Sequence, residues 1–386
     1  MKASDFKGKI DFALITIRDD EHRAVLARFP SQGIIEGTWD CSLSKINIIE
    51  SNEYYNVAVA RCAEKGTGDA QYVANCLITD LDPNWILLVG IAGGVPSDDF
   101  TLGDVVIASR LVDFCVEAVT PNGSQYDTYG GPMHPVIQNY IVNLAAKEKE
   151  FKGWNSVKSI GRKKPPVDLN DNPFYGDTNW KEKVREKLQK EFSGSRIRPP
   201  KFITATNISS DRLVKDPSIL QKWHETARGI QSIEMELAGI YRAARKKDKE
   251  FPILAIRGIS DIVGFKRHDD WTQYACHSAA ALAKALITKT KPITPKIQSS
   301  KSQISTNSNK KKQEDQETKL NLLTRLSKLP NPVFNNLLTI LTPTNGLISQ
   351  GVPQATQSSE LITWAESELG CGLPDIEEVL GKLTNP

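Results

Sequence analysis

Two acidic residues, Glu234 and Glu236, lie in the stretch SIEMELAGIY, on either side of Met235 and directly before an apolar segment of helical period. Neighbouring apolar residues predict that this stretch is partly buried. An ionised carboxylate only accepts hydrogen bonds, so a carboxylate held in such surroundings could bind both hydroxyls of a ribose. The alternative is that both acids belong to a solvated helix face.

Two further stretches could bring a ligand to the ends of strands. In ILAIRGISDIVG, a predicted buried strand delivers Ser260 and Asp261 at its carboxyl end, where open α/β sheets bind their ligands. The alternative is that Asp261 caps the following helix. In WILLVGIAGG, Gly93 and Gly94 lack a Cβ and would let a ligand approach the backbone, although a tight turn without a ligand is the alternative. The spacing is not G-x-G-x-x-G, so we predict no dinucleotide site.

The elements that must position these residues alternate along the chain. Short, β-branched apolar runs predict strands covered on both faces, at Ile10–Ile17, Trp85–Ile91, Val105–Ala108, Phe202–Ala205 and Ile253–Ile256. Helical periodicity predicts helices at Asp20–Phe29, Gly68–Asp80, Ser232–Lys246 and Trp271–Thr288. This alternation predicts an α/β fold over residues 1–290, with a central mixed, mostly parallel sheet flanked by helices.

Two segments interrupt or follow that domain. Residues 145–200 are rich in Lys, Glu, Pro and Trp and predict an elaboration with one helix near Lys181–Phe192. Residues 291–318 are mostly polar and predict a disordered linker. Residues 319–386 then predict a small all-α domain, because apolar positions return at helical spacing from Leu320 onward.

The predicted tail domain contains four short helices. Pro332 suits the first turn of the second helix, and a third is expected from Ser358 to Leu369, with Gly370 or Gly372 as its stop. Asp375–Leu383 completes the domain. Its expected core is Leu323, Phe334, Leu338, Trp364 and Leu380. A domain this small has little room for a catalytic cleft, so we interpret it as an interaction module.

The composition excludes several classes of protein. Residues 291–319 carry four more positive than negative charges, so the rest of the chain has a net charge of −1, which argues against a nucleic-acid footprint. Six cysteines without Cys-x-x-Cys spacing predict neither a zinc site nor disulfides, but thiols in a reducing compartment. Because no signal-peptide stretch and no apolar run of membrane-spanning length occurs, we expect a cytoplasmic protein without a membrane partner.

In this order and spacing, the stretches resemble the purine nucleoside phosphorylase and uridine phosphorylase superfamily, closest to methylthioadenosine and S-adenosylhomocysteine nucleosidases. The resemblance covers Ile10–Thr288 apart from residues 145–200. It implies that Glu21, in DDEHRAVL, positions the attacking water, and that Asp261 protonates purine N7. The implied substrate-binding residues are Glu236, Met235, Glu234, Gly93, Ile91, Leu213, Val214 and Ser260.

Departures from the family pattern sharpen the expected activity. The chain has IRDDEHR where hexameric phosphorylases carry a Gly-Asp-Pro turn and further phosphate-binding arginines, so hydrolysis of a purine N-glycosidic bond is favoured over phosphorolysis. Ile91 replaces a serine and Leu213 replaces an aromatic residue of the nucleosidases. A phosphate-dependent phosphorylase and a catalytically silent nucleotide sensor remain the alternatives. We expect no metal or organic cofactor.

The C-terminal tail shows a second resemblance, which bears on the expected partners. The stretches LSKLPNPVF and LITWAESELGCGLPDIEEVL are similar to bacterial effector-associated domains, which implies a protein partner and a regulated effector in a defence or signalling system. The substrate could then be a nucleotide such as ATP. Candidate phosphate contacts are Arg18, Arg23, Arg212, Lys215, Lys266 and Arg267. We also expect a homo-oligomer.

Overall fold

The computed structural model describes residues 1–48, 51–121, 123–170, 173–194, 197–227, 229–245, 249–297, 319, 321–343, 348–349, 351–365, 367 and 371–384. The chain divides into two compact units, Met1–Gln298 and Ser299–Pro386. Of the sequence expectations, the linker at 298–318, Leu320, Lys246 and Gly370 lie outside the described residues.

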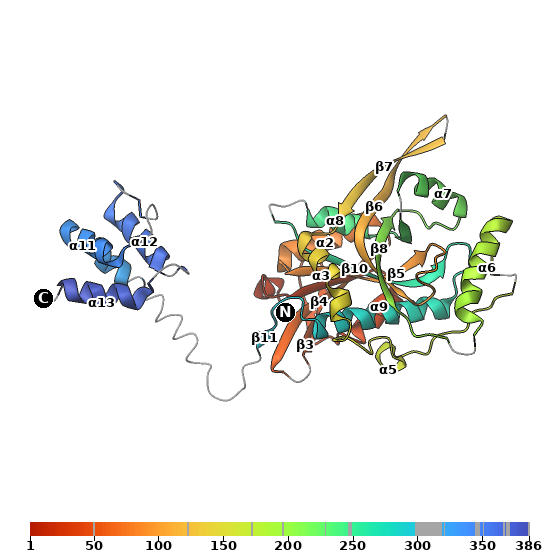
Figure 1. Cartoon of the computed structure of the whole chain (residues 1–386), viewed down its shortest axis with the longest axis horizontal. Coiled ribbons are helices and arrows are strands. Elements are labelled where there is room, and N and C mark those ends of the chain that lie inside the picture. The colour runs from red at the N-terminus through yellow and green to blue at the C-terminus, as the bar shows by residue number, and fades with distance from the viewer. Residues whose placement is uncertain are drawn as a thin grey trace. The chain divides into compact units, whose positions relative to one another are not determined.

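One sheet runs through the larger unit (Figure 1). In the described part of the chain it has 11 strands: β1 (Phe12–Thr16), β2 (Gly33–Ile35), β3 (Cys41–Asn47), β4 (Glu53–Arg61), β5 (Trp85–Gly94), β6 (Val105–Thr120), β7 (Gly123–Pro132), β8 (Phe202–Ser209), β9 (Ile230–Glu234), β10 (Ile253–Ile262) and β11 (Lys296–Ile297). The sheet is mixed, as expected. Parallel pairing joins β4, β1, β5 and β10, and also β6, β8 and β9.

The sheet splits along one edge of β5, and the candidate site lies at this gap. On one edge, β5 pairs with β10 along Ile86–Gly94. On the other edge it pairs with β1 only as far as Leu88, and then with β9 from Gly93 onward. Residues 89–92 therefore have no strand partner on that edge, which leaves backbone groups available there. Because β10 also pairs with β6, the strands β5, β10, β6, β8 and β9 close into a ring.

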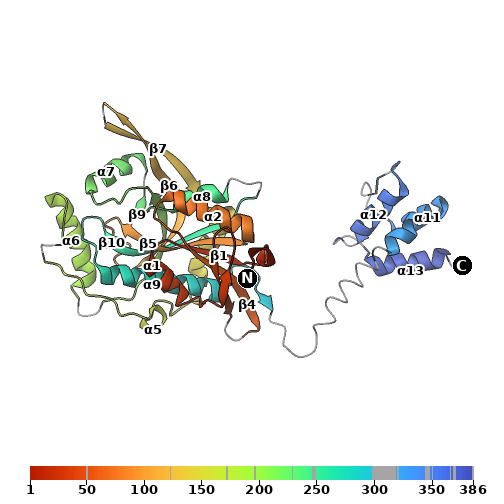
Figure 2. The ribbon, with the colours of Figure 1, turned by 180° about the vertical axis from the view of Figure 1, so that it is seen from behind.

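Helices cover both faces of this sheet. They are α1 (Asp19–Leu26), α2 (Thr67–Leu81), α3 (Pro135–Val142), α4 (Leu144–Lys147), α5 (Val157–Ile160), α6 (Thr178–Phe192), α7 (Pro217–Thr226), α8 (Leu237–Ala244) and α9 (Asp269–Lys289), after a 3₁₀ turn at Ala3–Phe6. The pair α1 and α9 lies on one face and the pair α2 and α8 on the other (Figures 1 and 2). Gly258 permits the close approach of α9 to β10, since a Cβ there would collide with the backbone of Ala275.

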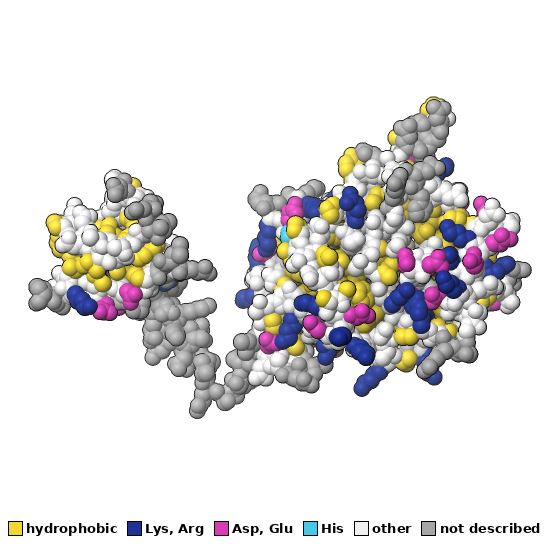
Figure 3. Space-filling model, viewed as in Figure 1, with side chains coloured by type: hydrophobic (Ala, Val, Ile, Leu, Met, Phe, Trp, Pro, Cys, Tyr) yellow, Lys and Arg dark blue, Asp and Glu magenta, His cyan; other side chains and the backbone are white. Residues whose placement is uncertain are grey.

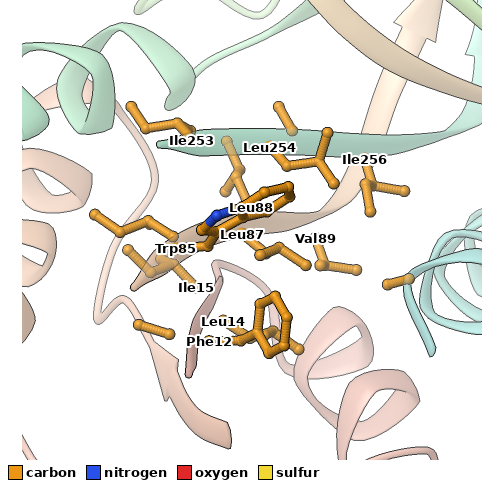
Figure 4. Close-up of a cluster of buried hydrophobic side chains, with 14 of the residues drawn as sticks. Phe12, Leu14, Ile15, Trp85, Leu87, Leu88, Val89, Ile253, Leu254 and Ile256 are labelled. Atoms are coloured by element: carbon orange, nitrogen blue, oxygen red, sulfur yellow. The ribbon is translucent and has the colours of Figure 1, made fainter. Parts of the chain in front are cut away.

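The core of the larger unit is built where β1, β5 and β10 lie side by side (Figure 4). Phe12, Trp85 and Ile253, which Figure 4 labels, are the first residues of β1, β5 and β10 and are buried. The rings of Phe12 and Trp85 meet edge to face with centroids 6.1 Å apart. Nearly continuous apolar strands of this kind are expected where helices cover both sides of a sheet.

Several predicted elements are present, and three differ. The helix expected over Ser232–Lys246 begins only at Leu237, because Ile230–Glu234 form β9 between β8 and β5. Lys296 and Ile297, expected in the linker, pair with β4. Strand β6 runs far beyond Ala108 and forms a hairpin with β7 that projects from the body of the unit (Figure 1).

The elaboration at 145–200 packs against the rest of the larger unit. Its helix α6 buries Trp180, Val184 and Leu188. The indole Nε1 of Trp180 donates to the carbonyl oxygen of Val263 at 2.8 Å. The segment therefore supports the chain that follows β10. This is a structural role that the single expected helix did not indicate.

The smaller unit is helical, with α11 (Asn331–Leu341), α12 (Gln354–Ala365), α13 (Leu373–Thr384) and a helical stretch at 321–327. Phe334, Trp364 and Leu380 are buried in its core as expected. Leu323 and Leu338 are only partly buried, because the neighbouring Leu322 and Leu337 point inward instead.

The charged side chains and the cysteines of the described residues are distributed as follows. Lysine and arginine are interspersed with aspartate and glutamate on the face of the larger unit shown in Figure 3, rather than gathered in one basic patch. All six cysteines are free thiols. No described helix combines the length and the apolar character needed to cross a bilayer.

Candidate active site

A pocket of about 180 Å³ lies where the carboxyl ends of β1, β5, β9 and β10 converge. It therefore occupies the split in the sheet beside β5. Its walls contain twelve of the residues expected from the sequence: Arg18, Glu21, Ile91, Gly93, Arg212, Leu213, Val214, Glu234, Met235, Glu236, Asp261 and Arg267. These residues come from five separate parts of the chain, and the fold brings them together.

Glu21, in the first turn of α1, is held by backbone donors. Its Oε2 accepts hydrogen bonds from the N–H groups of Ile17 at 2.9 Å and Arg18 at 3.0 Å. Its Oε1 accepts from the N–H of Ile91 at 2.9 Å, in the part of β5 that lacks a strand partner on this edge. The carboxylate is only 2 % exposed. Ile91 thus contributes its backbone, although its side chain also lines the pocket.

Arg257 lies beneath the pocket and connects its carboxylates. Its side chain is fully buried, and its Nη2 donates to Glu236 at 2.9 Å and also to Glu234. Its Nη1 lies 4.0 Å from Oε1 of Glu21. A buried guanidinium requires such partners, because an unpaired charge is costly away from water. Arg257 therefore holds three acidic side chains from α1, β9 and the start of α8 around one point.

Glu236 and Glu234 differ in what they contact. Glu234 accepts from the backbone N–H groups of Glu236 and Leu237 at 3.1 and 2.9 Å, so it caps the start of α8. Glu236 accepts from the N–H of Gly66 at 3.4 Å and lines the pocket. Burial raises the pKa of Glu236 to about 7; Arg257 opposes this shift, while Glu234 and Glu21 add to it. The three carboxylates outnumber the one guanidinium, so a proton on Glu236 relieves their mutual repulsion.

Asp261 lies within β10, and its neighbours occupy one of its two oxygens. Oδ1 accepts from Ser260 Oγ at 2.6 Å and from Arg267 Nε at 2.9 Å. Oδ2 lies beside Gly93, where the Cβ of any larger residue would come within 3.3 Å of it. The cap of α9 is His268, so the alternative role of Asp261 as a helix cap is wrong. Oδ2 is the oxygen placed to meet a ligand beside Gly93, which lies within β5 rather than in a turn.

Asp211 anchors the loop that forms the outer wall. Its carboxylate accepts from the backbone N–H and the hydroxyl of Thr67, both at 2.8 Å, at the start of α2. This contact places the adjacent Arg212, Leu213 and Val214 along the pocket. Leu213 is 61 % exposed, a large apolar side chain at the mouth of the pocket.

Four residues expected at the site do not line the pocket. Ser260 lies behind Asp261, to which it donates. Arg23 points to the surface and binds Asp19 at 2.6 Å, and neither Lys215 nor Lys266 reaches the wall. Arg267, expected as a phosphate contact, instead binds Asp261 and Ser260.

The sequence reasoning missed three charged residues of this site: Arg257, Lys65 and Asp211. The sequence did contain a signal for Arg257, since it is the one charged residue in the run ILAIRGI and must have a buried partner if that run forms a buried strand. No comparable signal pointed to Lys65 or Asp211, because both lie in polar loops where charged residues are common.

A protein-family model described as the phosphorylase superfamily matches residues 48–288. Among curated proteins, the chain is 26% identical over 296 residues to a death domain-containing ATP nucleosidase of Amphimedon queenslandica, covering 72% of this chain and 49% of that protein. It is 26% identical over 275 residues to the ATP nucleosidase Cap17 of Escherichia coli, covering 70% and 46%. The chain thus spans about half the length of the curated relatives it matches.

Among solved structures, an adenine complex of a methylthioadenosine/S-adenosylhomocysteine nucleosidase from Colwellia psychrerythraea is 15% identical. The match covers 75% of this chain and 98% of that one, with a TM-score of 0.49.

Proposed function

This chain belongs to the phosphorylase superfamily, and we propose that it hydrolyses the N-glycosidic bond of a purine nucleoside or nucleotide. The proposal rests on one observation: Glu21, Glu236 and Asp261 line a single pocket around Gly93. A protein that only binds nucleotides would need no acidic group beside the purine in addition to the carboxylate that binds the ribose. The names of the curated relatives support ATP as one of the substrates.

In the proposed complex the purine lies between Gly93 and Val214, with N7 at Oδ2 of Asp261. The ribose lies over Met235, and Glu236 accepts its hydroxyls. Glu236 releases its proton to solvent when the sugar binds, so that its carboxylate accepts from the hydroxyls and from Arg257. Arg257 then fixes Glu236 in place, because a carboxylate with two partners has little freedom to rotate.

The reaction breaks the bond between C1′ and the purine N9, and the bonding electrons leave with the base. Asp261 shares a proton with N7, so that the base departs neutral, while positive charge builds on the ribosyl ring. Glu21 accepts a proton from the water that attacks C1′, which fits its backbone-held position. General acid–base steps of this kind typically contribute about 10²–10⁴-fold each.

The test is the release of free base from adenosine, methylthioadenosine, ATP and GTP, with and without inorganic phosphate, resolved by chromatography. We expect base release without phosphate, and Asp261→Asn should slow it by about 10²-fold. Strict dependence on phosphate would instead establish a phosphorylase. Binding of nucleotide without any base release would establish a sensor, and near-wild-type turnover of Asp261→Asn would remove Asp261 from the mechanism.

We further propose that the smaller unit recruits a protein partner and makes the enzyme a regulated effector in a defence or signalling system. The name of the Amphimedon queenslandica relative includes a death domain beside its nucleosidase part, which supports a nucleosidase joined to an interaction module. We propose a homo-oligomer in the cytoplasm, where the free thiols would remain reduced. Size-exclusion chromatography with light scattering tests the oligomeric state.

A further inference from the structure

A second cavity adjoins the pocket, and we call it the side lobe. It measures about 690 Å³ and shares Ile17, Arg18 and Lys65 with the pocket. Its charged walls are Arg18, Asp19, Asp20, Arg61, Glu64 and Lys65. The pocket therefore opens into the side lobe along the loops that follow β1 and β4.

We infer that the side lobe binds the phosphate chain on the 5′ carbon of the substrate, with Lys65 as the residue that selects for it. The inference rests on the proposed function, because that function fixes which end of the nucleotide enters the pocket. With the base at Asp261 and the ribose hydroxyls at Glu236, the 5′ substituent points away from both. Gly66, whose N–H bonds to Glu236, directly follows Lys65. The sugar and Lys65 are thus neighbours.

The charges of the side lobe differ from those of the pocket floor. The floor carries the buried carboxylates of Glu21, Glu234 and Glu236, which would repel phosphate. In the side lobe, Asp19 and Asp20 are already neutralised by arginines, so Glu64 is the one carboxylate there without an ion pair among the described residues. Asp20 takes two hydrogen bonds from Arg18, at 2.8 and 2.7 Å.

Asp19 likewise binds Arg23 at 2.6 Å and Arg61 at 3.1 Å. Each guanidinium has five N–H donors and can also bind phosphate. Both Arg18 and Arg61 keep part of their side chains exposed to solvent.

Lys65 is the cation that has no competing partner. Within the described part of the chain, its ammonium makes neither a hydrogen bond nor an ion pair, although it lines both cavities. Arg212 and Arg267 also line the pocket, but Arg212 is paired with Glu117 and Arg267 with Asp261. An unpaired, exposed ammonium loses no existing contact when it binds a phosphate.

The test compares kcat/KM for base release from ATP and from adenosine in Lys65→Ala and in the wild type. We expect the ATP-to-adenosine ratio to fall about tenfold or more, the usual size of a lost hydrogen bond to a charged group. Lys158→Ala is the matched control, since Lys158 is exposed on α5 and lines neither cavity. Its ratio should stay at the wild-type value. An unchanged ratio in Lys65→Ala would overturn the inference.

Titration with inorganic tripolyphosphate separates this inference from the proposed function. The full-length wild type should bind tripolyphosphate at least about tenfold more tightly than Lys65→Ala, by calorimetry. This result would support the side lobe even if no base were released from any purine, in which case only the proposed function fails. Equal binding by the two proteins would refute the side lobe as a phosphate site, whatever the enzyme activity.

Discussion

Replacing Gly90 with alanine would insert one methyl group beneath the carboxylates of the pocket. Gly90 lies buried in β5, opposite Arg257 in the β5–β10 pairing. An ideal Cβ there would lie 2.5 Å from Nη1 of Arg257 and 2.7 Å from the carboxyl carbon of Glu21, and closer still to Glu21 Oε1. Favourable carbon contacts occur at about 3.5–4.0 Å. Glu21 or Arg257 must therefore move by roughly 1 Å.

The magnitude follows from this overlap. Overpacking a well-packed interior usually costs about 1–3 kcal/mol. The backbone of Gly90 is not in the left-handed region, so alanine brings no conformational strain of its own. A displacement of about 1 Å at a reacting group can lower the rate by about 10²-fold. We therefore expect Gly90→Ala to be destabilised by about 1–3 kcal/mol and slowed by about 10²-fold.

Gly68→Ala is the matched control, because it makes the same chemical change without the overlap. Gly68 lies in the first turn of α2, and a Cβ there would meet nothing within 4 Å. Alanine in a helix is favoured over glycine by about 0.5–1 kcal/mol. The two variants should thus shift the free energy of unfolding in opposite directions.

Urea unfolding and base release measure the two effects. If Gly90→Ala were as stable and as active as the wild type, Glu21 and Arg257 could not lie above β5 as described. Loss of stability with full activity would show that Arg257 moves while Glu21 remains in position.

Three further predictions concern the pH dependence, the elaboration and the division into units. Since burial raises the pKa of Glu236 to about 7, the folded protein holds a proton that the unfolded chain loses near pH 4.5. The free energy of unfolding should therefore fall as pH rises from about 4.5 to 7. Urea unfolding at several pH values should show this fall in the wild type but not in Glu236→Gln. An equal fall in the variant would contradict the prediction. Trp180→Phe removes the donor to the buried carbonyl of Val263 and should cost about 1–3 kcal/mol, whereas unchanged urea stability would show that water replaces it. Truncation after Gln298 should leave a soluble larger unit with its own thermal transition and base release; a folded but inactive product would mean that the smaller unit completes the active site or a required oligomer.

The sequence alone determined which segments with apolar periodicity form helices and strands, and which acidic residues lie at the ends of strands. Strands β1, β5 and β10 were predictable because each is a short, continuous apolar run, and this pattern depends on residues close together in the chain. The same local reasoning placed Glu236 before a helix and Asp261 at the end of β10. It failed at β9, where a short buried strand directly precedes the helix and the two apolar patterns merge.

Only the tertiary structure decided how these stretches meet. The split in the sheet at β5 leaves the N–H of Ile91 for Glu21, and it depends on strand order and register. Arg257 acquires its partners because β10 lies beside β5 and close to the start of α8. Lys65 reaches the pocket only because the loop after β4 lies next to the loop after β1. Periodicity reports which face of an element is buried, but contacts between distant segments depend on how crossovers and strand pairing place those segments in space.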